Sequence, residues 1–238
     1  MIKMINKRSK KAMILAGGLG TRLRPLTFAI PKPLIPVREK PIIEHIILLL
    51  KKHGFTDIYI SVGYRSELVR LYCGDGTAFG VMIHYFEEKK PYGTAGPLAS
   101  FKEIGLDKNE PILVINGDIL TDINLVSFLR FHKDEGNQLT VALVNYKHQL
   151  SYGVVEMGQG NKISGIVEKP VYSFNVSGGI YLVNADCLSL VPENKYFTMP
   201  ELVKKMLKAK MIVGGFKVKD FWLAIEQLKD IEDANSRR

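Results

Sequence analysis

The stretch that decides the fold is Met13-Ile14-Leu15-Ala16-Gly17-Gly18-Leu19-Gly20-Thr21-Arg22-Leu23-Arg24-Pro25, and Pro31-Lys32-Pro33-Leu34 follows soon after it. A short apolar run that ends in a cluster of glycines is typical of a buried strand followed by a tight loop. Glycines let the main chain approach a phosphate closely, and successive N–H groups form a concavity of positive potential. Arg22, Arg24 and Lys32 add full positive charges nearby. The stretch therefore predicts a strand and a loop that binds an anion.

Two common phosphate loops do not fit this stretch. A Walker A loop needs Lys and then Ser or Thr directly after its last Gly, but Gly20 is followed by Thr21 and Arg22. The dinucleotide fingerprint, counted from Gly18, needs a Gly where Leu23 stands. An ordinary glycine-rich turn after a first strand remains the plain alternative.

The bulk properties are those of one globular domain. A chain of 238 residues with 46% hydrophobic and 24% charged residues is long enough for a single large α/β domain with a proper core. We expect residues 1–10, which are rich in Lys and Arg, to be a solvated and frayed terminus, and residues 11–238 to be the domain. The isolated Cys73 and Cys187 predict two buried thiols, without a disulfide framework or zinc site.

The net charge of +9 is compatible with nucleic-acid binding or with the handling of polyanionic small molecules. Aromatic residues do not interleave with the basic run, and no nucleic-acid-binding motif is visible, so we expect no nucleic-acid partner. The sequence has neither an apolar run long enough for a membrane helix nor the apolar core of a signal peptide. These features predict a cytoplasmic protein that does not bind membranes.

Strands and helices are predicted to alternate at intervals of roughly 25 residues, which indicates right-handed crossovers and a mainly parallel sheet. Ligands of such sheets bind beyond the carboxyl ends of the strands. The predicted helices are 41–50, 66–73, 95–104, 125–136, 200–210 and 227–235, and the predicted strands are 13–16, 56–62, 81–86, 111–115, 139–146, 152–156, 162–168, 179–183 and one or two within 213–223. The three short strands from 152 onward predict a smaller, partly antiparallel lobe over the site.

The pattern GGxGTRLxPLT followed by PKPL resembles the signature of sugar-1-phosphate nucleotidylyltransferases. Four later stretches match that family in order, so the resemblance runs from Lys11 to Asn235; they are 91–96 (PYGTAG), 116–118 (NGD), 152–156 (YGVVE) and 168–170 (EKP). The resemblance implies a Rossmann-like three-layer sandwich with a mainly parallel mixed sheet and a small antiparallel sugar-binding lobe, similar to the GT-A fold. It also implies Mg²⁺, a nucleoside triphosphate and a sugar 1-phosphate as cofactor and substrates, and a nucleotide sugar and pyrophosphate as products.

The reaction explains the residue types. An oxygen of the sugar phosphate must attack the α-phosphorus while pyrophosphate leaves, so the site has to hold two polyanions that repel one another. The expected nucleotide-binding residues are Leu15, Ala16, Gly17, Gly18, Gly20, Thr21, Arg22, Glu88, Gly93 and Thr94. The expected sugar-phosphate-binding residues are Asn116, Gly153, Glu168, Lys169 and Gly179, and the expected catalytic residues are Arg22, Lys32, Asp118 and Lys169.

By this resemblance Arg22 stabilises the leaving pyrophosphate, Lys32 lies near the reacting phosphates and Lys169 binds the sugar phosphate. Asp118, at the carboxyl end of a buried strand, is placed to bind Mg²⁺, an ion that prefers one or two carboxylates together with phosphate oxygens and water. Plain alternatives stay open: Asp118 as a turn residue, Glu168 as the end of a strand, and each Lys or Arg as a solvated charge.

Glu88 precedes Gly93 by five residues, and by the resemblance this position faces the base. Guanine offers N1–H and N2–H₂ side by side, which a carboxylate can accept together, whereas uracil and thymine offer one N–H between two carbonyls. Glu88 therefore favours GTP, unless it is one more solvated charge in 87–90. The run 93–98 is also similar to mannose-1-phosphate and manno-heptose-1-phosphate guanylyltransferases; mannose, a manno-heptose and an amino sugar remain open as the sugar.

One motif of the family is altered. Members usually carry Trp-x-Asp-Ile-Gly before the last helix, with the Asp as a second metal ligand, but here Ala224 stands in that place. On a strand Asp220 would lie about 13 Å away at ~3.3 Å per residue, whereas Glu226 is expected to be within reach from the following loop. This departure supports a second hypothesis, a catalytically weak or inactive paralogue that binds nucleotide sugar and regulates a partner. We expect an active enzyme, a homodimer as the commonest default, and no second catalytic domain after residue 238.

Overall fold

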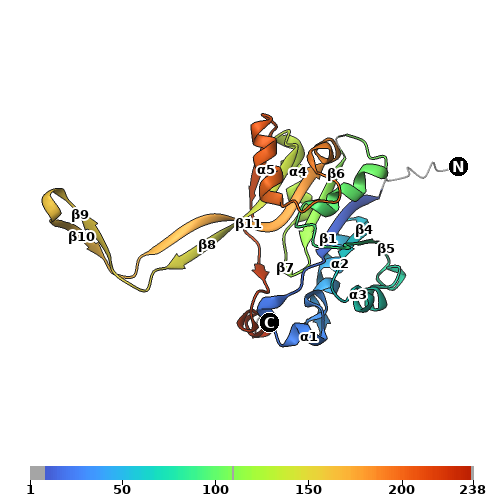
Figure 1. Ribbon diagram of the computed structural model, residues 1–238, viewed down its shortest axis with the longest axis horizontal. Coiled ribbons are helices and arrows are strands. Elements are labelled where there is room, and N and C mark those ends of the chain that lie inside the picture. Colours follow the sequence, from blue (N-terminus) through green and yellow to red (C-terminus); the bar gives the residue numbers. More distant parts are fainter. Residues whose placement is uncertain (1–8, 109, 237–238) are drawn as a thin grey trace.

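The computed structural model describes residues 9–108 and 110–236, and within them seven strands form one mixed sheet in the order β12-β8-β11-β6-β1-β4-β5 (Figure 1). The strands are β1 (Lys10–Ala16), β2 (Pro36–Val37), β3 (Lys40–Pro41), β4 (Phe55–Val62), β5 (Met82–Glu87), β6 (Pro111–Asn116), β7 (Ile119–Thr121), β8 (Leu139–Gln149), β9 (Val154–Met157), β10 (Ile163–Val167), β11 (Val171–Asn184), β12 (Val213–Lys217) and β13 (Trp222–Ala224). The α-helices are α1 (Leu26–Ala29), α2 (Ile42–Lys52), α3 (Ser66–Cys73), α4 (Leu125–Asp134), α5 (Met199–Lys208) and α6 (Leu228–Ser236).

The predicted mainly parallel sheet is confirmed. Strand β1 pairs in parallel with β4 and β6, β4 pairs in parallel with β5, and β8 pairs in parallel with β12. Only β11 runs against its neighbours, β6 and β8, among the sheet strands that the structure describes. The carboxyl ends of β1, β4 and β6 therefore lie at one edge of the sheet.

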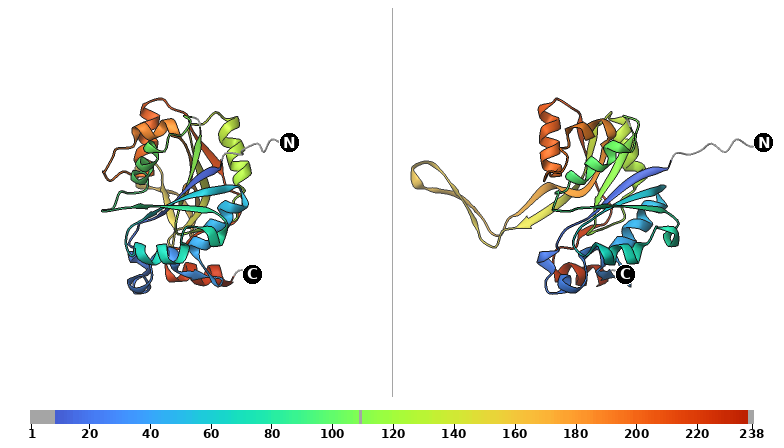
Figure 2. Two further views of the ribbon diagram at one scale, coloured as in Figure 1. Left: turned by 90° about the vertical axis from the view of Figure 1, so that its right-hand side faces the viewer. Right: turned by 45° about the vertical axis from the view of Figure 1, so that its right-hand side comes forward.

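The central strands are buried on both faces, and their alternating side chains feed two cores. Ile14 of β1 faces the core that contains residues of α2, α3, α4 and α6, whereas Met13 faces the core of α5 and the 3₁₀ segments Gly96–Glu103 and Ala185–Leu190. The helices thus form a layer on each side of the sheet, and Figure 2 shows α4 and α5 on opposite sides. This is the three-layer sandwich that the sequence predicts.

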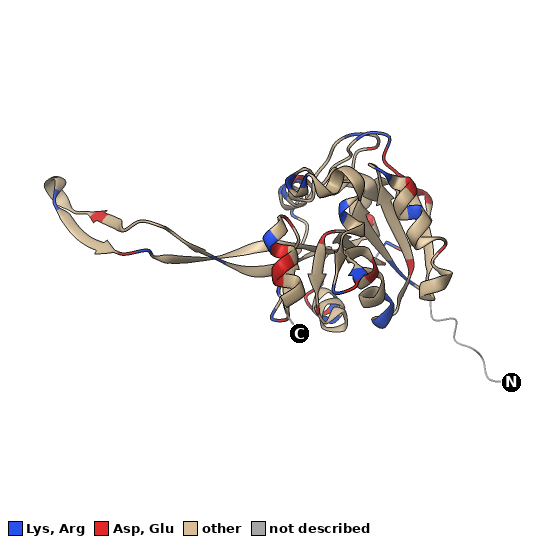
Figure 3. Cartoon of the chain, turned by 90° about the horizontal axis from the view of Figure 1, so that it is seen from below, with Lys and Arg blue, Asp and Glu red and all other residues tan. Residues whose placement is uncertain are grey.

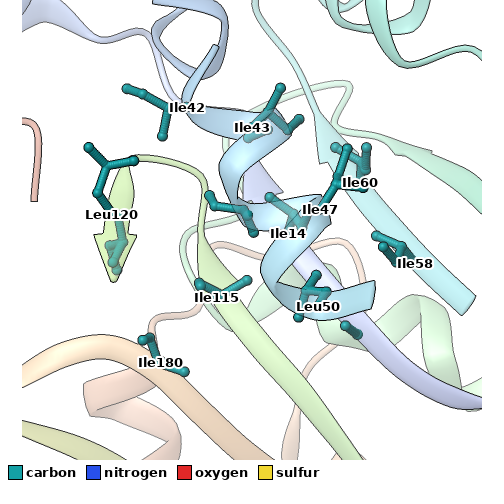
Figure 4. Close-up of a cluster of buried hydrophobic side chains, with 14 of the residues drawn as sticks. Ile14, Ile42, Ile43, Ile47, Leu50, Ile58, Ile60, Ile115, Leu120 and Ile180 are labelled. Carbon is teal, nitrogen blue, oxygen red and sulfur yellow. The ribbon is translucent and has the colours of Figure 1, made fainter. Parts of the chain in front are cut away.

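Helix α2 shows how the sequence makes such a layer. Pro41 precedes its first turn, and Gly54, with φ +80°, follows its end. Its fully buried apolar side chains recur at helical spacing and pack on alternate residues of the neighbouring strands (Figure 4); they are Ile42, Ile43, Ile46, Ile47 and Leu50. The predicted helix is confirmed; it begins one residue later and ends two residues later than the predicted range 41–50.

The antiparallel segment differs from the prediction in its position. Strands β9 and β10 do pair antiparallel, but they form the tip of a long arm that projects from the body (Figure 1). Strands β8 and β11 remain paired without interruption from Leu143–Ser177 to Gln149–Val171, so the ribbon carries the tip outward as a continuation of the sheet. The expectation of a lobe folded over the site is therefore wrong for this chain. The predicted short strand 179–183 is the inner end of the long β11.

Smaller differences concern local structure. The predicted helix 95–104 is a 3₁₀ helix, Gly96–Glu103, with Pro97 in its first turn. Strand β7 and its pairing with β13 were not predicted. Cys73 and Cys187 are buried free thiols, as predicted. Of the predicted frayed terminus, residues 1–8 lie outside the described residues, and Lys10 belongs to β1. Within the described part of the chain, the helices are all too short or too polar to cross a membrane.

Candidate active site

A pocket of about 300 Å³ opens where β1, β5 and β6 end. This is the edge at which ligands of parallel sheets bind. The pocket is lined by Leu15, Ala16, Gly17, Gly18, Gly20, Lys32, Pro33, Glu88, Pro91, Gly93, Thr94, Asn116, Gly117, Asp118 and Tyr196. The structure thus brings together most of the residues that the sequence predicts to bind the nucleotide.

The glycines of the first loop differ in their surroundings. A Cβ on Gly17 would lie 2.2 Å from Glu88 Oε1, so the main chain of the loop is pressed against that carboxylate. Gly20 has φ +60°, a conformation that favours glycine. A Cβ on Gly18 would meet nothing within 4 Å. The loop is therefore packed at Gly17 and Gly20 and open toward the pocket at Gly18.

Glu88 is half-buried, whereas Glu87, Lys89 and Lys90 around it are exposed. Its Oε1 accepts a hydrogen bond of 2.5 Å from Ser61 Oγ, and its Oε2 accepts one of 3.0 Å from the main-chain N–H of Tyr92. Each carboxylate oxygen has a second lone pair. The alternative of a freely solvated charge is excluded, and a fixed carboxylate forms part of the pocket wall.

Lys32 and Asp118 form an ion pair in the pocket, and both side chains are largely buried. Lys32 comes from the 3₁₀ turn Lys32–Leu34, and Asp118 follows β6 in the tight connection to β7. Gly117 makes this connection possible, because a Cβ there would lie 2.7 Å from the carbonyl oxygen of Leu15.

A second, smaller hollow of about 190 Å³ adjoins the first and shares Gly20, Lys32 and Asp118 with it. Its other lining residues are Thr21, Arg22, Leu23 and Glu226. Arg22 Nη1 donates a hydrogen bond of 2.7 Å to Glu226 Oε2. The Lys32–Asp118 pair is therefore the common wall of a single, two-part cleft.

The last strand brings the altered motif to this cleft. Ala224 of β13 pairs with Ile119 of β7, and the N–H of Ile225 donates to the carbonyl oxygen of Asp118 at 2.9 Å. Ala224 therefore stands beside Asp118, where a second carboxylate was expected. Asp220 instead accepts a hydrogen bond from the N–H of Asn124 before α4, and it does not line the cleft.

The residues of the cleft fit a metal ion only in part. Among the described residues, no group of three or more His, Cys, Asp or Glu side chains could hold a metal ion. Asp118 and Glu226 line the same hollow, and each is paired with a cation. Such a pair of carboxylates suits Mg²⁺, which takes most of its ligands from phosphate oxygens and water. The cleft as it stands offers two cationic and three anionic side chains, counting Glu88.

The segment 92–96 is held by the loop before α5. Gly93 has φ +74°, and a Cβ on it would lie 2.6 Å from the carbonyl oxygen of Phe197. That oxygen accepts the N–H groups of Ala95 and Gly96, and Thr94 Oγ1 accepts the N–H of Met199 at 2.8 Å. Gly93 and Thr94 thus reach the pocket as predicted, with the Thr94 hydroxyl engaged in fixing the wall.

Asn116 and Gly179, two of the predicted sugar-phosphate-binding residues, lie against each other at the cleft. A Cβ on Gly179 would lie 2.6 Å from Asn116 Nδ2. Asn116 Oδ1 is buried and has no hydrogen-bond partner among the described residues. A buried acceptor without a donor is costly, and this oxygen is a polar group that the described residues leave unpaired.

The other three predicted sugar-phosphate-binding residues lie in the arm, away from the cleft. A Cβ on Gly153 would lie 2.9 Å from Glu168 Oε2, and Lys169, with φ +45°, follows directly. At ~3.3 Å per residue along β11, Lys169 is roughly 30 Å from Gly179. The motifs YGVVE and EKP do come together, as a pair at the bend of the arm.

Leu23 in the smaller part of the cleft and four residues in the larger part were not predicted; the four are Pro33, Pro91, Gly117 and Tyr196. The first three lie inside the quoted motifs, so their positions gave a signal. Tyr196 comes from the loop before α5, is 63% exposed and carries no local signature of a ligand contact.

A family model described as "Nucleotidyl transferase" matches residues 11–238. A curated mannose-1-phosphate guanyltransferase of Gibberella zeae is 35% identical over 225 residues, which are 92% of this chain and 62% of that protein. A UTP–glucose-1-phosphate uridylyltransferase of Synechocystis sp. is 34% identical over 251 residues, with 94% and 65% covered. The chain thus spans less than two thirds of the length of these relatives.

Solved structures share the fold. A Bacillus anthracis structure described as a glucose-1-phosphate thymidylyltransferase in complex with a sucrose superposes with a TM-score of 0.75 and 28% sequence identity. The match covers 95% of this chain and 94% of that one. All three names describe the transfer of a nucleotidyl group to a sugar 1-phosphate, but the nucleotide differs: guanylyl, uridylyl or thymidylyl.

Proposed function

The chain belongs to the nucleotidyl transferase family, and from that premise we propose that it forms a nucleotide sugar and pyrophosphate from a nucleoside triphosphate and a sugar 1-phosphate. The observation that carries this proposal is the two-part cleft joined at the Lys32–Asp118 pair. One part is large enough for a nucleoside and is bordered by the glycine loop, and the other has Arg22 at its rim. We further propose that the protein acts in the cytoplasm.

In the proposed reaction an oxygen of the sugar phosphate attacks the α-phosphorus of the triphosphate. A P–O bond forms, the bond between the α-phosphorus and the bridging oxygen breaks, and its electron pair leaves with pyrophosphate. The N–H groups around Gly18 hold the triphosphate, and Lys32 neutralises charge on the transferring group. Arg22 leaves Glu226 to bind the departing pyrophosphate.

Mg²⁺ is the proposed cofactor, with Asp118 and Glu226 as its protein ligands. When bound, it would neutralise phosphate charge and polarise the α-phosphoryl group. With Asp118 engaged in that way, Lys32 would be free to contact phosphate, and the ion pair keeps both side chains in position before the substrates arrive.

GTP is the proposed nucleotide, and Glu88 is the proposed reader of its base. Ser61 and Tyr92 fix the carboxylate in the pocket wall, and each of its oxygens keeps one lone pair for the two adjacent N–H donors of guanine. Mannose 1-phosphate is the proposed sugar substrate, in line with the names of several relatives. Asn116, which lines the pocket, is the proposed partner of a hydroxyl of the sugar.

Ala224 beside Asp118 is the observation that favours a second candidate, a protein that binds nucleotide sugar without turnover. Pyrophosphate release separates the two. We expect turnover with GTP and mannose 1-phosphate in a matrix of five nucleoside triphosphates and several sugar 1-phosphates with Mg²⁺ varied widely. A protein that GTP or GDP-mannose stabilises against heat, but that releases no pyrophosphate with any pair, would be the second candidate.

A further inference from the structure

The arm, residues 145–175, has the composition of an interface although it is surrounded by solvent. All of these residues are described, and none is buried. Ten of its large apolar side chains are exposed: Tyr146, Tyr152, Val155, Met157, Ile163, Ile166, Val167, Val171, Tyr172 and Phe174. Its charged residues are few, namely Lys147, Glu156, Lys162, Glu168 and Lys169, and Figure 3 shows them as isolated coloured segments separated by uncharged stretches. A two-stranded ribbon of this kind is marginal alone, and a large exposed apolar surface marks a contact site.

The cleft in the body lacks positive charge for its proposed substrates. Its lining carries Lys32 and Arg22 against Asp118, Glu226 and Glu88, and each cation is already paired. A nucleoside triphosphate and a sugar phosphate together bring several further negative charges. Mg²⁺ offsets two of them, so at least one more cation is needed near the reacting phosphates.

The arm carries a lysine, Lys169, that the cleft of the same chain does not use. Lys169 follows Glu168 at the bend, and its carbonyl oxygen accepts Gln149 Nε2 at 3.5 Å. Glu168 lies against Gly153. No residue of the arm lines either part of the cleft as the described residues define it.

The continuous pairing of β8 with β11 prevents the arm from folding back onto the cleft of its own chain. Strands β8 and β11 are paired from Leu143–Ser177 to Gln149–Val171, and the N–H of Leu150 donates to the carbonyl oxygen of Pro170 at 3.0 Å. Lys169 therefore stays roughly 30 Å along the strand from Gly179. For Lys169 to reach the cleft of its own chain, the hydrogen bonds between β8 and β11 would have to break.

From these four observations we propose that a second copy of this chain receives the arm, and that the Lys169 of one protomer completes the cleft of the other. The exchange is reciprocal, so two identical contacts close a two-fold dimer and cover both arms. Each copy offers an apolar arm that carries Lys169 and a cleft that is short of positive charge, so the arm of one copy suits the cleft of the other. This inference rests on the proposed function, because it assigns Lys169 to the sugar phosphate.

The test is complementation between two variants. Lys32→Ala damages the body of the cleft, and Lys169→Ala damages the arm. We expect each homodimer to lose at least ~10-fold in kcat/KM for the sugar phosphate, since a charge-assisted contact is lost. The two are co-expressed with different affinity tags, and the mixed dimer is isolated through both tags. If the arm acts on its partner, one of its two clefts is intact, so about half of the wild-type kcat per dimer returns.

Lys162→Ala is the matched control, because Lys162 is also an exposed lysine of the arm but lies between β9 and β10, away from Glu168 and Lys169. Its homodimer is expected to keep the wild-type kcat and KM. Light scattering is expected to give a dimer of the 26.7 kDa chain. A fully active monomer, or a mixed dimer without rescue, would overturn the inference and leave the proposed function standing. A wild-type protein silent with every substrate pair would overturn both.

Discussion

Arg22 Nη1 donates a hydrogen bond to Glu226 Oε2 at 2.7 Å, although 204 residues separate the two in the chain. The side chains are 74% and 56% exposed, so the pair itself contributes little to stability, on the order of 0.2–1 kcal/mol. Its importance is positional: it holds a carboxylate at the hollow where Ala224 offers none. Glu226 is thus the one described side chain placed to replace the missing carboxylate beside Asp118.

We expect Glu226→Gln to raise the Mg²⁺ concentration needed for half-maximal activity roughly 10-fold or more, with kcat largely restored at saturating Mg²⁺. The amide keeps the size of the side chain and a hydrogen-bond acceptor for Arg22, but it removes the negative charge. Asp220→Asn is the matched control, because it neutralises a carboxylate of the same segment that does not line the cleft. An unchanged Mg²⁺ titration of Glu226→Gln would assign Glu226 to the Arg22 contact alone.

Ala224→Asp should have the opposite effect. The main chain of Ala224 is already paired beside Ile119, so a carboxylate introduced there stands next to Asp118 without a change of fold. We expect the half-maximal Mg²⁺ concentration to fall at least several-fold, and the double variant Ala224→Asp with Glu226→Gln to regain the wild-type requirement. If Ala224→Asp leaves the Mg²⁺ titration as it is, the segment does not hold the ion.

The sequence predicts the body of this protein well because its signals are local. The burial pattern of β1, the apolar face of α2 and the glycines of the first loop are each set by neighbours in the chain. The motifs then place Gly17, Lys32 and Asp118 at one edge of the sheet by the ordinary rule for parallel strands. Cleft residues that belong to quoted motifs were therefore within reach of sequence reasoning.

The position of the arm was not within reach, because it depends on a pairing between distant segments. The sequence shows short strands with glycines between them, which is equally consistent with a lobe folded over the site. Only the register of β8 against β11, extended from Ser177 to Val171, determines that the ribbon points outward. Tyr196 was missed for the same reason, since the contacts of Phe197 with the 92–96 segment bring its loop to the pocket.

Gly18→Ala tests the role of the loop. Because a Cβ on Gly18 meets nothing within 4 Å and its φ is not positive, we expect the melting temperature to stay within about 2 °C of the wild type. The same methyl group would occupy the space through which a phosphate approaches the main chain. KM for the triphosphate is therefore expected to rise at least ~10-fold, with a much smaller change in KM for the sugar phosphate.

The contrast to this variant is Gly20→Ala. There a Cβ lies 2.9 Å from Thr27 Cγ2, and the main chain has φ +60°. Gly20→Ala should lower the melting temperature by several degrees, since a strained residue costs about 1–3 kcal/mol. If Gly18→Ala were to lower the melting temperature equally, or to bind the triphosphate normally, the open glycine would not be a phosphate contact.

Glu88→Gln tests the choice of base. A Gln can still accept from one of its two present donors, but it no longer offers two acceptor oxygens to guanine. We expect kcat/KM with GTP to fall ~10–100-fold, as for a lost bidentate contact of about 1–3 kcal/mol, and the other triphosphates to change less. Glu87→Gln, an exposed neighbour paired with Arg70, is the control. An equal loss with all triphosphates would make Glu88 a brace for the loop rather than a reader of the base.

His132 belongs to a buried polar network through which the stability of the fold is expected to depend on pH. His132 of α4 is 2% exposed; its Nδ1 lies 2.8 Å from Thr140 Oγ1 and its Nε2 lies 2.9 Å from Asn184 Oδ1. Burial lowers the pKa of His132 below its usual value of 6.5. The unfolded chain therefore takes up a proton near pH 6.5 that the folded chain takes up only at lower pH. The stabilising contribution of neutral His132 is complete above pH 6.5 and is lost as the pH falls toward the folded-state pKa.

His132→Phe removes this titration while it fills the same space. At pH 8 we expect the variant to be less stable than the wild type by about 1–3 kcal/mol, because Thr140 and Asn184 lose a hydrogen-bond partner. Between pH 6.5 and pH 5.5 the difference should shrink by up to ~1.4 kcal/mol, since only the wild type then loses the contribution of the neutral ring. Urea unfolding at several pH values measures this, with the exposed His148→Phe as control. A difference in the free energy of unfolding that stays constant over this range would show that His132 is protonated equally in both states.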